Sequence, residues 1–171
     1  MRKLESQGLI QIFPKRYAQV ATFSEKEIQD IGMIRISLDI LSIKLVAING
    51  SKAELLNLKS IAVQCLDAFR NNDGVQRRKL DSDFHKELCR ISKNNLLFNM
   101  QEDLSLKIQF ILMHNDFKSV NDEQHLYQHI QIVDALIEGD IEKALKLDIQ
   151  HLSEFYCLDI DSPIEFFLKN A

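Results

Sequence analysis

The chain has 171 residues, of which 46% are hydrophobic and 27% are charged, and its formal net charge at pH 7 is −4. This composition excludes a disordered or collagen-like chain. Five glycines and two prolines are too few turn formers for many short strands, so long helices are expected. The three cysteines are far apart and form no CxxC pair, which excludes a zinc ribbon or a disulfide scaffold and predicts reduced thiols in a cytoplasmic protein.

The first 23 residues differ from the rest in pattern and charge. Residues 1–7 are expected to form a helix that ends at Gly8, because glycine tolerates the positive φ of a helix C-terminus. The segments LIQIF and YAQVA then predict a β-hairpin whose tip carries Lys15 and Arg16. Four basic residues against one acidic residue give this part a net charge of +3, so it is the part expected to meet a polyanion.

From Ser24 onward the sequence predicts a series of helices. Ser24 and Glu27 have the spacing of a capping box, which marks the start of the first one. Apolar residues at steps of three and four predict six amphipathic helices, at 24–47, 51–69, 76–91, 95–113, 124–138 and 141–156. Pro163 prevents a continuous helix in the tail, whose apolar residues are expected to pack on the body: Ile164, Phe166 and Phe167. The predicted fold class is all-α, an antiparallel bundle of about six or seven helices behind the short helix and hairpin.

No segment of the sequence is expected to enter a membrane. The run LDILSIKLVAI is interrupted by Asp39 and Lys44 and is too short to span a bilayer. The start, MRKLESQGL, lacks the apolar region of a signal peptide. A membrane partner is therefore not predicted.

The segment KLDSDFHKELC places two polar residues beside an apolar stripe. Asp81 and His85 are four residues apart, next to the stripe formed by Leu80, Phe84 and Leu88. Residues at this spacing lie about 5–6 Å apart at Cβ and point the same way. Both side chains can therefore bind one ion.

Two other helices bring histidines to their buried sides. His129 begins the spacing His129, Ile132, Val133 and Leu136, and His151 shares a row with Ala144, Asp148 and Phe155. One buried histidine is usually a satisfied core residue, but three imidazoles and one carboxylate from three helices predict a mononuclear metal site. This donor set suits zinc, nickel, manganese or iron, with zinc or nickel favoured, and open coordination positions would accept a bidentate carboxylate.

An ordered set of short motifs runs through the helical part. They are Arg35-x-x-Leu38-Asp39, Asp81-x-x-Phe84-His85, Asn94, His129-x-x-Ile132-x-x-Ala135-Leu136, Gly139-Asp140, Ala144 and His151-Leu152. Over roughly residues 24–156 this set resembles the ligand-binding domain of FadR-type regulators in the GntR family. The preceding RKLESQGLIQIFPKRYAQVATFS resembles the end of the recognition helix and the wing of that family's winged helix-turn-helix.

The resemblance implies a division into a winged-helix remnant at 1–23 and a helical metal-binding, effector-binding and dimerisation domain at 24–171. The chain would then be a bacterial regulator that lacks most of its DNA reader. The family pattern also implies a homodimer, a small organic acid as effector, and Arg35 as a residue that reaches it. His125, one turn before His129, can face the same pocket. The implied ligands of one divalent metal ion are Asp81, His85, His129 and His151.

The hairpin tip is expected to contribute little to DNA binding by this chain. Lys15 and Arg16 can contact phosphates, but two charges give little affinity by counterion release. Tyr17 stands where the family's wing often has glycine. DNA is therefore expected to be a partner of the full-length protein, and negligible specific binding is expected here.

The residues leave three functions open. The first is an effector sensor whose ligand shifts the pose of the DNA-reading heads. The second is a metal-free helical oligomerisation module with hydrogen-bonded buried histidines. The third is a mononuclear metal-dependent enzyme, which is disfavoured because no paired Glu-x-x-His motif and no identifiable general base accompany the metal residues. No catalytic residue is assigned.

Overall fold

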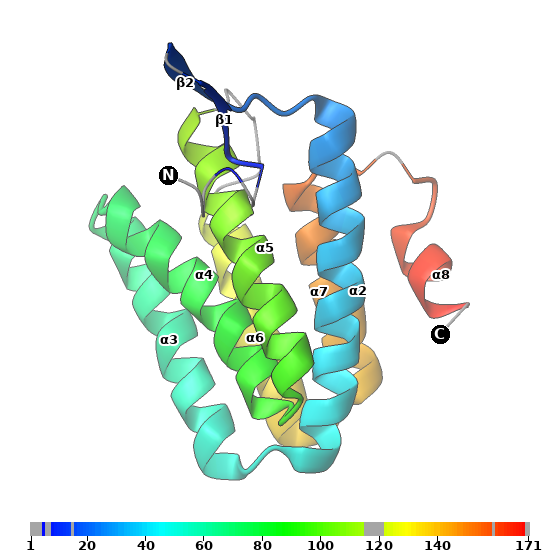
Figure 1. The fold of residues 1–171 in the computed structure, drawn as a ribbon. Coiled ribbons are helices and arrows are strands. Elements are labelled where there is room, and N and C mark those ends of the chain that lie inside the picture. Colours follow the sequence, from blue (N-terminus) through cyan, green and yellow to red (C-terminus); the bar gives the residue numbers. More distant parts are fainter. Residues whose placement is uncertain (1–4, 6–7, 15, 115–121, 159, 170–171) are drawn as a thin grey trace.

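The computed structural model describes residues 5, 8–14, 16–114, 122–158 and 160–169. In these residues the chain forms seven helices and one two-stranded hairpin (Figure 1). The elements are β1 (Ile10–Phe13), β2 (Tyr17–Val20), α2 (Glu25–Asn49), α3 (Lys52–Arg70), α4 (Gly74–Ile91), α5 (Asn95–His114), α6 (Glu123–Glu138), α7 (Ile141–Phe155) and α8 (Pro163–Leu168). The expected all-α bundle is confirmed.

Side chains at the helix starts explain where the helices begin. The Ser24 and Ser51 hydroxyls accept hydrogen bonds from the backbone N–H groups of Glu27 and Glu54, whose carboxylates complete capping boxes. Gly139 ends α6 with φ of +79°, a conformation that glycine adopts without strain. Other residues whose side chains cap helix starts are Asp73 for α4, Asp122 for α6, Asp140 for α7 and Ser162 for α8.

Five helices surround the core in a closed ring. α2 packs on α4 and α7, α3 packs on α4 and α6, and α6 packs on α7. α5 lies outside this ring against α4 and α2, and α8 packs on α7 (Figure 1). Most of the large, fully buried side chains are apolar, with Phe84, Ile36 and Ile43 among them, but three are His85, His129 and His151. The ring therefore encloses imidazoles within an apolar interior.

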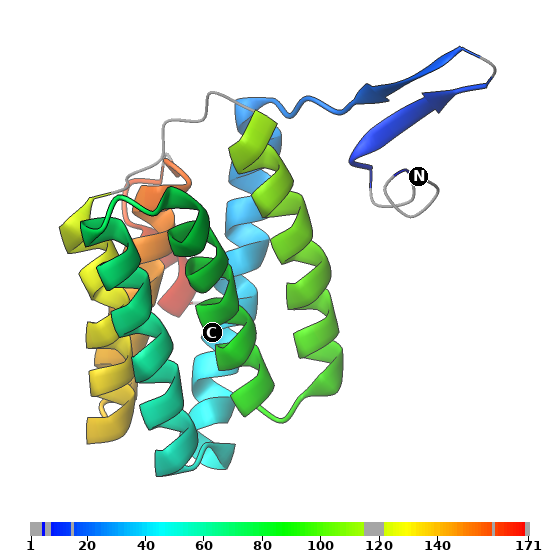
Figure 2. The same ribbon diagram turned by 90° about the vertical axis from the view of Figure 1, so that its left-hand side faces the viewer.

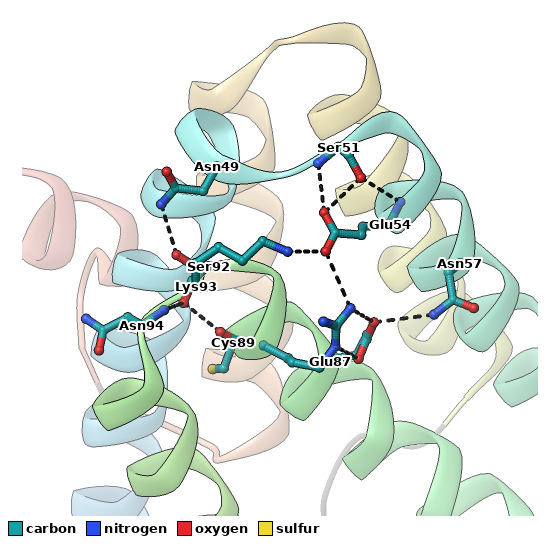
Figure 3. A network of polar contacts seen from close by, with 10 residues as sticks. Asn49, Ser51, Glu54, Asn57, Glu87, Cys89, Ser92, Lys93 and Asn94 are labelled. Atoms are coloured by element: carbon teal, nitrogen blue, oxygen red, sulfur yellow. Dashed lines mark hydrogen bonds and ion pairs between the residues drawn. The ribbon is translucent and has the colours of Figure 1, made fainter.

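A polar network joins the α2–α3 turn to the α4–α5 turn (Figure 3). Lys93 forms an ion pair with Glu54, and Arg90 binds Glu87 with Nε 2.6 Å from Oε2. The Asn49 amide donates to the Ser92 carbonyl at 3.0 Å. Exposed ion pairs of this kind contribute little one by one. Together they connect the C-terminal end of α4 to the turn that follows α2.

The hairpin extends from the N-terminal end of α2, away from the bundle (Figure 2). Phe13 pairs with Tyr17 across the strands, and their ring centroids are 4.7 Å apart. Arg16, expected at the tip, is exposed, whereas Lys15 lies outside the described residues. The expected hairpin is thus present, and phosphate contact by these two residues stays a prediction.

The two ends of the chain meet the sequence expectations in part. The helix expected over residues 1–7 falls largely outside the described residues, while Gly8 has the anticipated positive φ of +70°. α8 begins at Pro163, because proline is tolerated in a first helical turn. Ile164 and Phe167 pack on the core, whereas Phe166 is 45% exposed and meets the Phe167 ring edge-on at 5.0 Å. None of the described helices is both long enough and apolar enough to cross a membrane.

Candidate metal centre

Four polar side chains from three helices meet inside the ring. Asp81 and His85 come from α4, His129 from α6 and His151 from α7, and one ligand atom from each lies within 4.8 Å of the others. The three histidines are at most 1% exposed, while the Asp81 side chain is 24% exposed. The structure therefore brings together all four residues that the sequence selected.

The helical spacing and one aromatic ring set the geometry of this cluster. Phe84 packs against His129 with ring centroids 4.3 Å apart and meets His85 edge-on at 5.2 Å. Nε2 of His129 is 3.3 Å from Nε2 of His85 and 3.7 Å from Oδ1 of Asp81. The potential donor atoms of two helices thus face one another across a short gap.

The charge states of the cluster suit a divalent cation. Burial lowers the pKa of His129 to about 3, although Asp81 opposes the shift. Burial and the neighbouring imidazoles lower the pKa of His151 well below its usual value. Burial acts to raise the pKa of Asp81, but His129, His85 and Arg35 outweigh it and keep that pKa low. At neutral pH the cluster thus offers an ionised carboxylate and imidazoles with free lone pairs, which are the forms that bind metals.

Two histidines are held by side chains that the sequence did not single out for this role. Nδ1 of His85 is 2.6 Å from Oδ2 of Asp39, a fully buried residue of α2. Nδ1 of His151 is 3.1 Å from Oε1 of Gln128 on α6. Nδ1 of His129 has no hydrogen-bond partner among the described residues. The three imidazoles are therefore supported unequally.

Asp148 on α7 forms a second buried cluster with Asp39 and His85, whose potential ligand atoms lie within 4.8 Å of one another. Neither oxygen of Asp148 has a hydrogen-bond partner in the described part of the chain. Burial, reinforced by the negative Asp39, raises the pKa of Asp148 well above its usual value. Burial therefore favours the neutral form of Asp148 beside the site.

Arg35, the residue expected to reach an effector, is 3% exposed and borders the cluster. Its Nε is 3.5 Å from Oδ2 of Asp39, and it donates to the Gln101 amide oxygen at 2.7 Å when that oxygen faces it. Although burial opposes the shift, Asp39 raises the pKa of Arg35, so the guanidinium is charged. Part of its hydrogen-bonding capacity is thus used within the protein.

His125, the other residue expected near an effector, is buried beside His151. The two rings are stacked with centroids 4.0 Å apart and an interplanar angle of 19°. Neither ring nitrogen of His125 forms a hydrogen bond within the described residues, and Nδ1 is 3.9 Å from Oε2 of Glu154. Burial lowers the pKa of His125, so it adds a neutral imidazole to the cluster.

A small cavity adjoins the four-residue cluster. Its volume is about 10 Å³, and its walls include Arg35, Ile108, Phe155 and Tyr156. A space of this size holds about one water molecule. The room for an organic acid that the sequence led us to expect is therefore not present in this arrangement of side chains.

Comparisons with known proteins agree with this architecture. The family described as FCD domain matches residues 30–154. The chain is 25% identical over 154 residues to the HTH-type transcriptional regulator YdhC of Bacillus subtilis, covering 90% of this chain and 69% of that protein. It is 26% identical over 156 residues to the HTH-type transcriptional repressor RspR of Escherichia coli, covering 89% of this chain and 68% of that protein.

Solved structures show the same fold at low sequence identity. Escherichia coli McbR/YncC matches with a TM-score of 0.77 at 17% identity, covering 89% of this chain and 77% of that one. Streptococcus agalactiae GntR matches with a TM-score of 0.66 at 17% identity, covering 91% of this chain and 78% of that one.

Proposed function

Because this chain belongs to the FCD domain family, we propose that it is the effector-sensing part of a GntR-type transcription regulator, with a bound divalent metal ion and a small organic acid. The resemblance to the FadR-type ligand-binding domain is confirmed by the family match. The relatives are transcriptional regulators, which favours regulation over catalysis. The metal, the acid and the dimer are our proposals.

The proposed metal ion is held by Asp81, His85, His129 and His151. The observation that carries this proposal is the approach of four ligand atoms from three helices to within 4.8 Å of one another in the interior. Burying these polar groups without partners would be costly. A divalent ion satisfies them together, and the nitrogen-rich donor set favours zinc or nickel. When bound, the ion supplies a Lewis-acidic centre that can accept a carboxylate oxygen.

The balance of buried charge supports an acidic effector. By formal charge Arg35 contributes +1 and Asp39 and Asp81 contribute −1 each, whereas burial favours the neutral form of Asp148. These groups sum to −1, so a divalent ion brings the interior to +1. A small monocarboxylate would neutralise that charge, and uncompensated buried charge is unfavourable.

The proposed effector enters only if the cavity widens. Ile108 on α5 and Phe155 and Tyr156 at the end of α7 line the present space of about 10 Å³. An acid that reaches Arg35 and His125 must displace some of these side chains. Binding would then favour a conformation in which α5 or the end of α7 has moved, and this difference in affinity shifts the population.

The proposed partners are DNA, for the whole regulator, and a second copy of the chain. In this proposal residues 1–23 belong to a winged helix-turn-helix, with Lys15 and Arg16 as phosphate contacts, and 24–171 form the sensing and dimerisation domain. Dimerisation through the helical part would cover apolar side chains that α2 and α5 expose to solvent. They are Ile34, Leu41, Ile48, Leu96, Met100, Leu106 and Met113.

The metal proposal is tested by metal analysis of protein purified without chelators and then exposed to zinc or nickel. One ion per chain is expected for the wild type and for His125→Ala, which removes a buried imidazole outside the proposed ligand set. His129→Ala is expected to lose the ion while keeping its far-UV circular dichroism spectrum. A wild-type protein that takes up no metal would favour the metal-free oligomerisation module.

The effector proposal is tested by a thermal-shift screen of small hydroxy- and monocarboxylic acids. A ligand that binds only the folded state raises the melting temperature by mass action. The rise is expected with metal-loaded protein and is expected to disappear with chelator or in Arg35→Gln. A rise that survives chelation would contradict binding through the metal.

A further inference from the structure

A short hydrogen bond connects α2 to the proposed metal centre. Oδ2 of Asp39 lies 2.6 Å from Nδ1 of His85, and both side chains are at most 1% exposed. A carboxylate without a proton can only accept, so Nδ1 of His85 is the donor. The lone pair of this imidazole is then on Nε2, which faces Nε2 of His129 at 3.3 Å.

We propose that Asp39 is a positioning residue for the metal site, fixing the tautomer and ring orientation of His85 so that Nε2 is available to the ion. The inference rests on the proposed metal-binding function. A carboxylate on the far nitrogen of a metal-binding histidine also makes its ligand nitrogen more basic. Removing such a partner typically weakens metal binding by about 10–100-fold.

Asp39 is itself held in place. Nε of Arg35, one helical turn earlier, lies 3.5 Å from its Oδ2, and Arg35 in turn reaches the Gln101 amide on α5. The carboxylate is therefore paired with a buried cation as well as with His85. These two contacts hold the Asp39 carboxylate beside Nδ1 of His85.

The other two histidines have weaker hydrogen-bond partners at Nδ1 than His85 has, so substitutions of these partners are expected to differ in their effect on metal binding. His151 has the neutral amide of Gln128 at 3.1 Å, and neutral hydrogen bonds are roughly half as strong as charge-assisted ones. Nδ1 of His129 has no partner among the described residues. Loss of Asp39 is therefore expected to weaken metal binding more than loss of Gln128.

The test compares Asp39→Asn with Asp148→Asn, using cobalt(II) alone as the probe. Both variants make the same substitution beside His85, but the Asp148 carboxyl oxygens have no hydrogen-bond partner within the described residues. The amide that Asp39→Asn introduces can donate to Nδ1 of His85 and force the imidazole proton onto Nε2. Asp39→Asn is expected to lower cobalt affinity about 10–100-fold and to alter the visible absorption of the bound ion, whereas Asp148→Asn stays within about threefold of wild type.

A measurement on the wild type keeps the test decisive if Asp39→Asn does not fold. Long-range ¹H–¹⁵N spectra of the metal-free protein are expected to show His85 with its proton on Nδ1, and the Nε2–H tautomer would overturn the inference. Equal weakening by the two amide variants would also overturn it, because a general effect of substitution beside His85, and not this hydrogen bond, would then control affinity. No cobalt uptake by the wild type overturns the metal site itself, whereas uptake with unchanged affinity in Asp39→Asn overturns only the role of Asp39.

Discussion

Replacing Gly32 with alanine is expected to destabilise the protein, although alanine is the better helix former. Gly32 lies in the first half of α2, against the ring of Tyr156 at the end of α7. A Cβ at this position would be 2.5 Å from Cγ, 2.7 Å from Cβ and 2.9 Å from Cδ2 of Tyr156. These distances are far below van der Waals contact, so either the ring or the helix must move.

The expected loss of stability in Gly32→Ala follows from two opposing effects. Tyr156 is 3% exposed and lies edge-on to Phe155 with ring centroids 4.9 Å apart, so the ring has little room to retreat. Overpacking a core costs about 1–3 kcal/mol, and a clash at the base of a side chain belongs near the upper end. Replacing glycine with alanine inside a helix contributes about 1 kcal/mol of stabilisation. The net loss is about 2 kcal/mol, or about 4–8 °C in Tm.

The assay is urea unfolding followed by far-UV circular dichroism. Gly74→Ala is the matched control, because the nearest atom to its Cβ is Nη1 of Arg78 at 3.4 Å, and its stability is expected to equal or slightly exceed wild type. In a Tyr156→Ala background the Gly32→Ala change is expected to become neutral or stabilising. Gly32→Ala protein as stable as wild type would refute the packing argument.

Three further outcomes are expected. Acidification from pH 7 towards pH 4 should lower the Tm of the metal-free protein in calorimetry. Folding lowers the pKa of His129 to about 3 and also lowers the pKa values of His125 and His151, so these residues bind protons near pH 6.5 only in the unfolded state. Their contribution to the free energy of unfolding is therefore complete above pH 6.5 and is lost as the pH falls. Between pH 6.5 and pH 4 the loss from His129 alone is about 3 kcal/mol, from about 2.5 pH units at about 1.4 kcal/mol each. The raised pKa of Asp148 offsets part of it, and a Tm that rises on acidification would contradict these shifts. Ser51→Ala should cost about 1 kcal/mol in urea unfolding, whereas Ser51→Thr, which keeps the capping hydroxyl, should cost less. Phe84→Ala, at a fully buried ring 4.3 Å from His129, should cost about 3–5 kcal/mol and weaken metal uptake, and retention of wild-type stability would show that the ring is dispensable.

The helices were predictable because their signals are local. The capping box at Ser24 and the apolar steps after it place the start of α2 correctly. The apolar spacing predicts that the third helix begins at Gln76, two residues late, because Asp73 caps a helix that already includes Gly74. α8 was not predicted as a helix, since Pro163 marks both a break and an allowed first turn.

For the candidate site, the sequence predicts which helix face each residue lies on, but not how its side chain is oriented. Periodicity puts His129 and His151 on buried sides and His85 beside an apolar stripe. Their shared metal-binding chemistry and the family resemblance both group them with Asp81. Neither identifies which ring nitrogen of each histidine faces the cluster. The orientation of His85 depends on Asp39, 46 residues away in the sequence, and that of His151 depends on Gln128, 23 residues away. In the sequence Asp39 stood out only as an interruption of an apolar run and as part of a motif. The volume of the small cavity could not be predicted either, since it depends on how side chains from four helices, α2, α4, α5 and α7, pack together.

The length of α2 determines how far a tilt at the proposed site would displace the hairpin. This 25-residue helix follows the hairpin directly and holds Asp39 near its middle, where it is bonded to His85. With a rise of about 1.5 Å per residue, roughly 21 Å separate Asp39 from the first residue of the helix. Acting as a stiff rod with its pivot at that carboxylate, α2 would carry the hairpin end through about 2 Å for a tilt of about 5°. A small movement at the proposed metal site would thus produce a larger displacement of the hairpin.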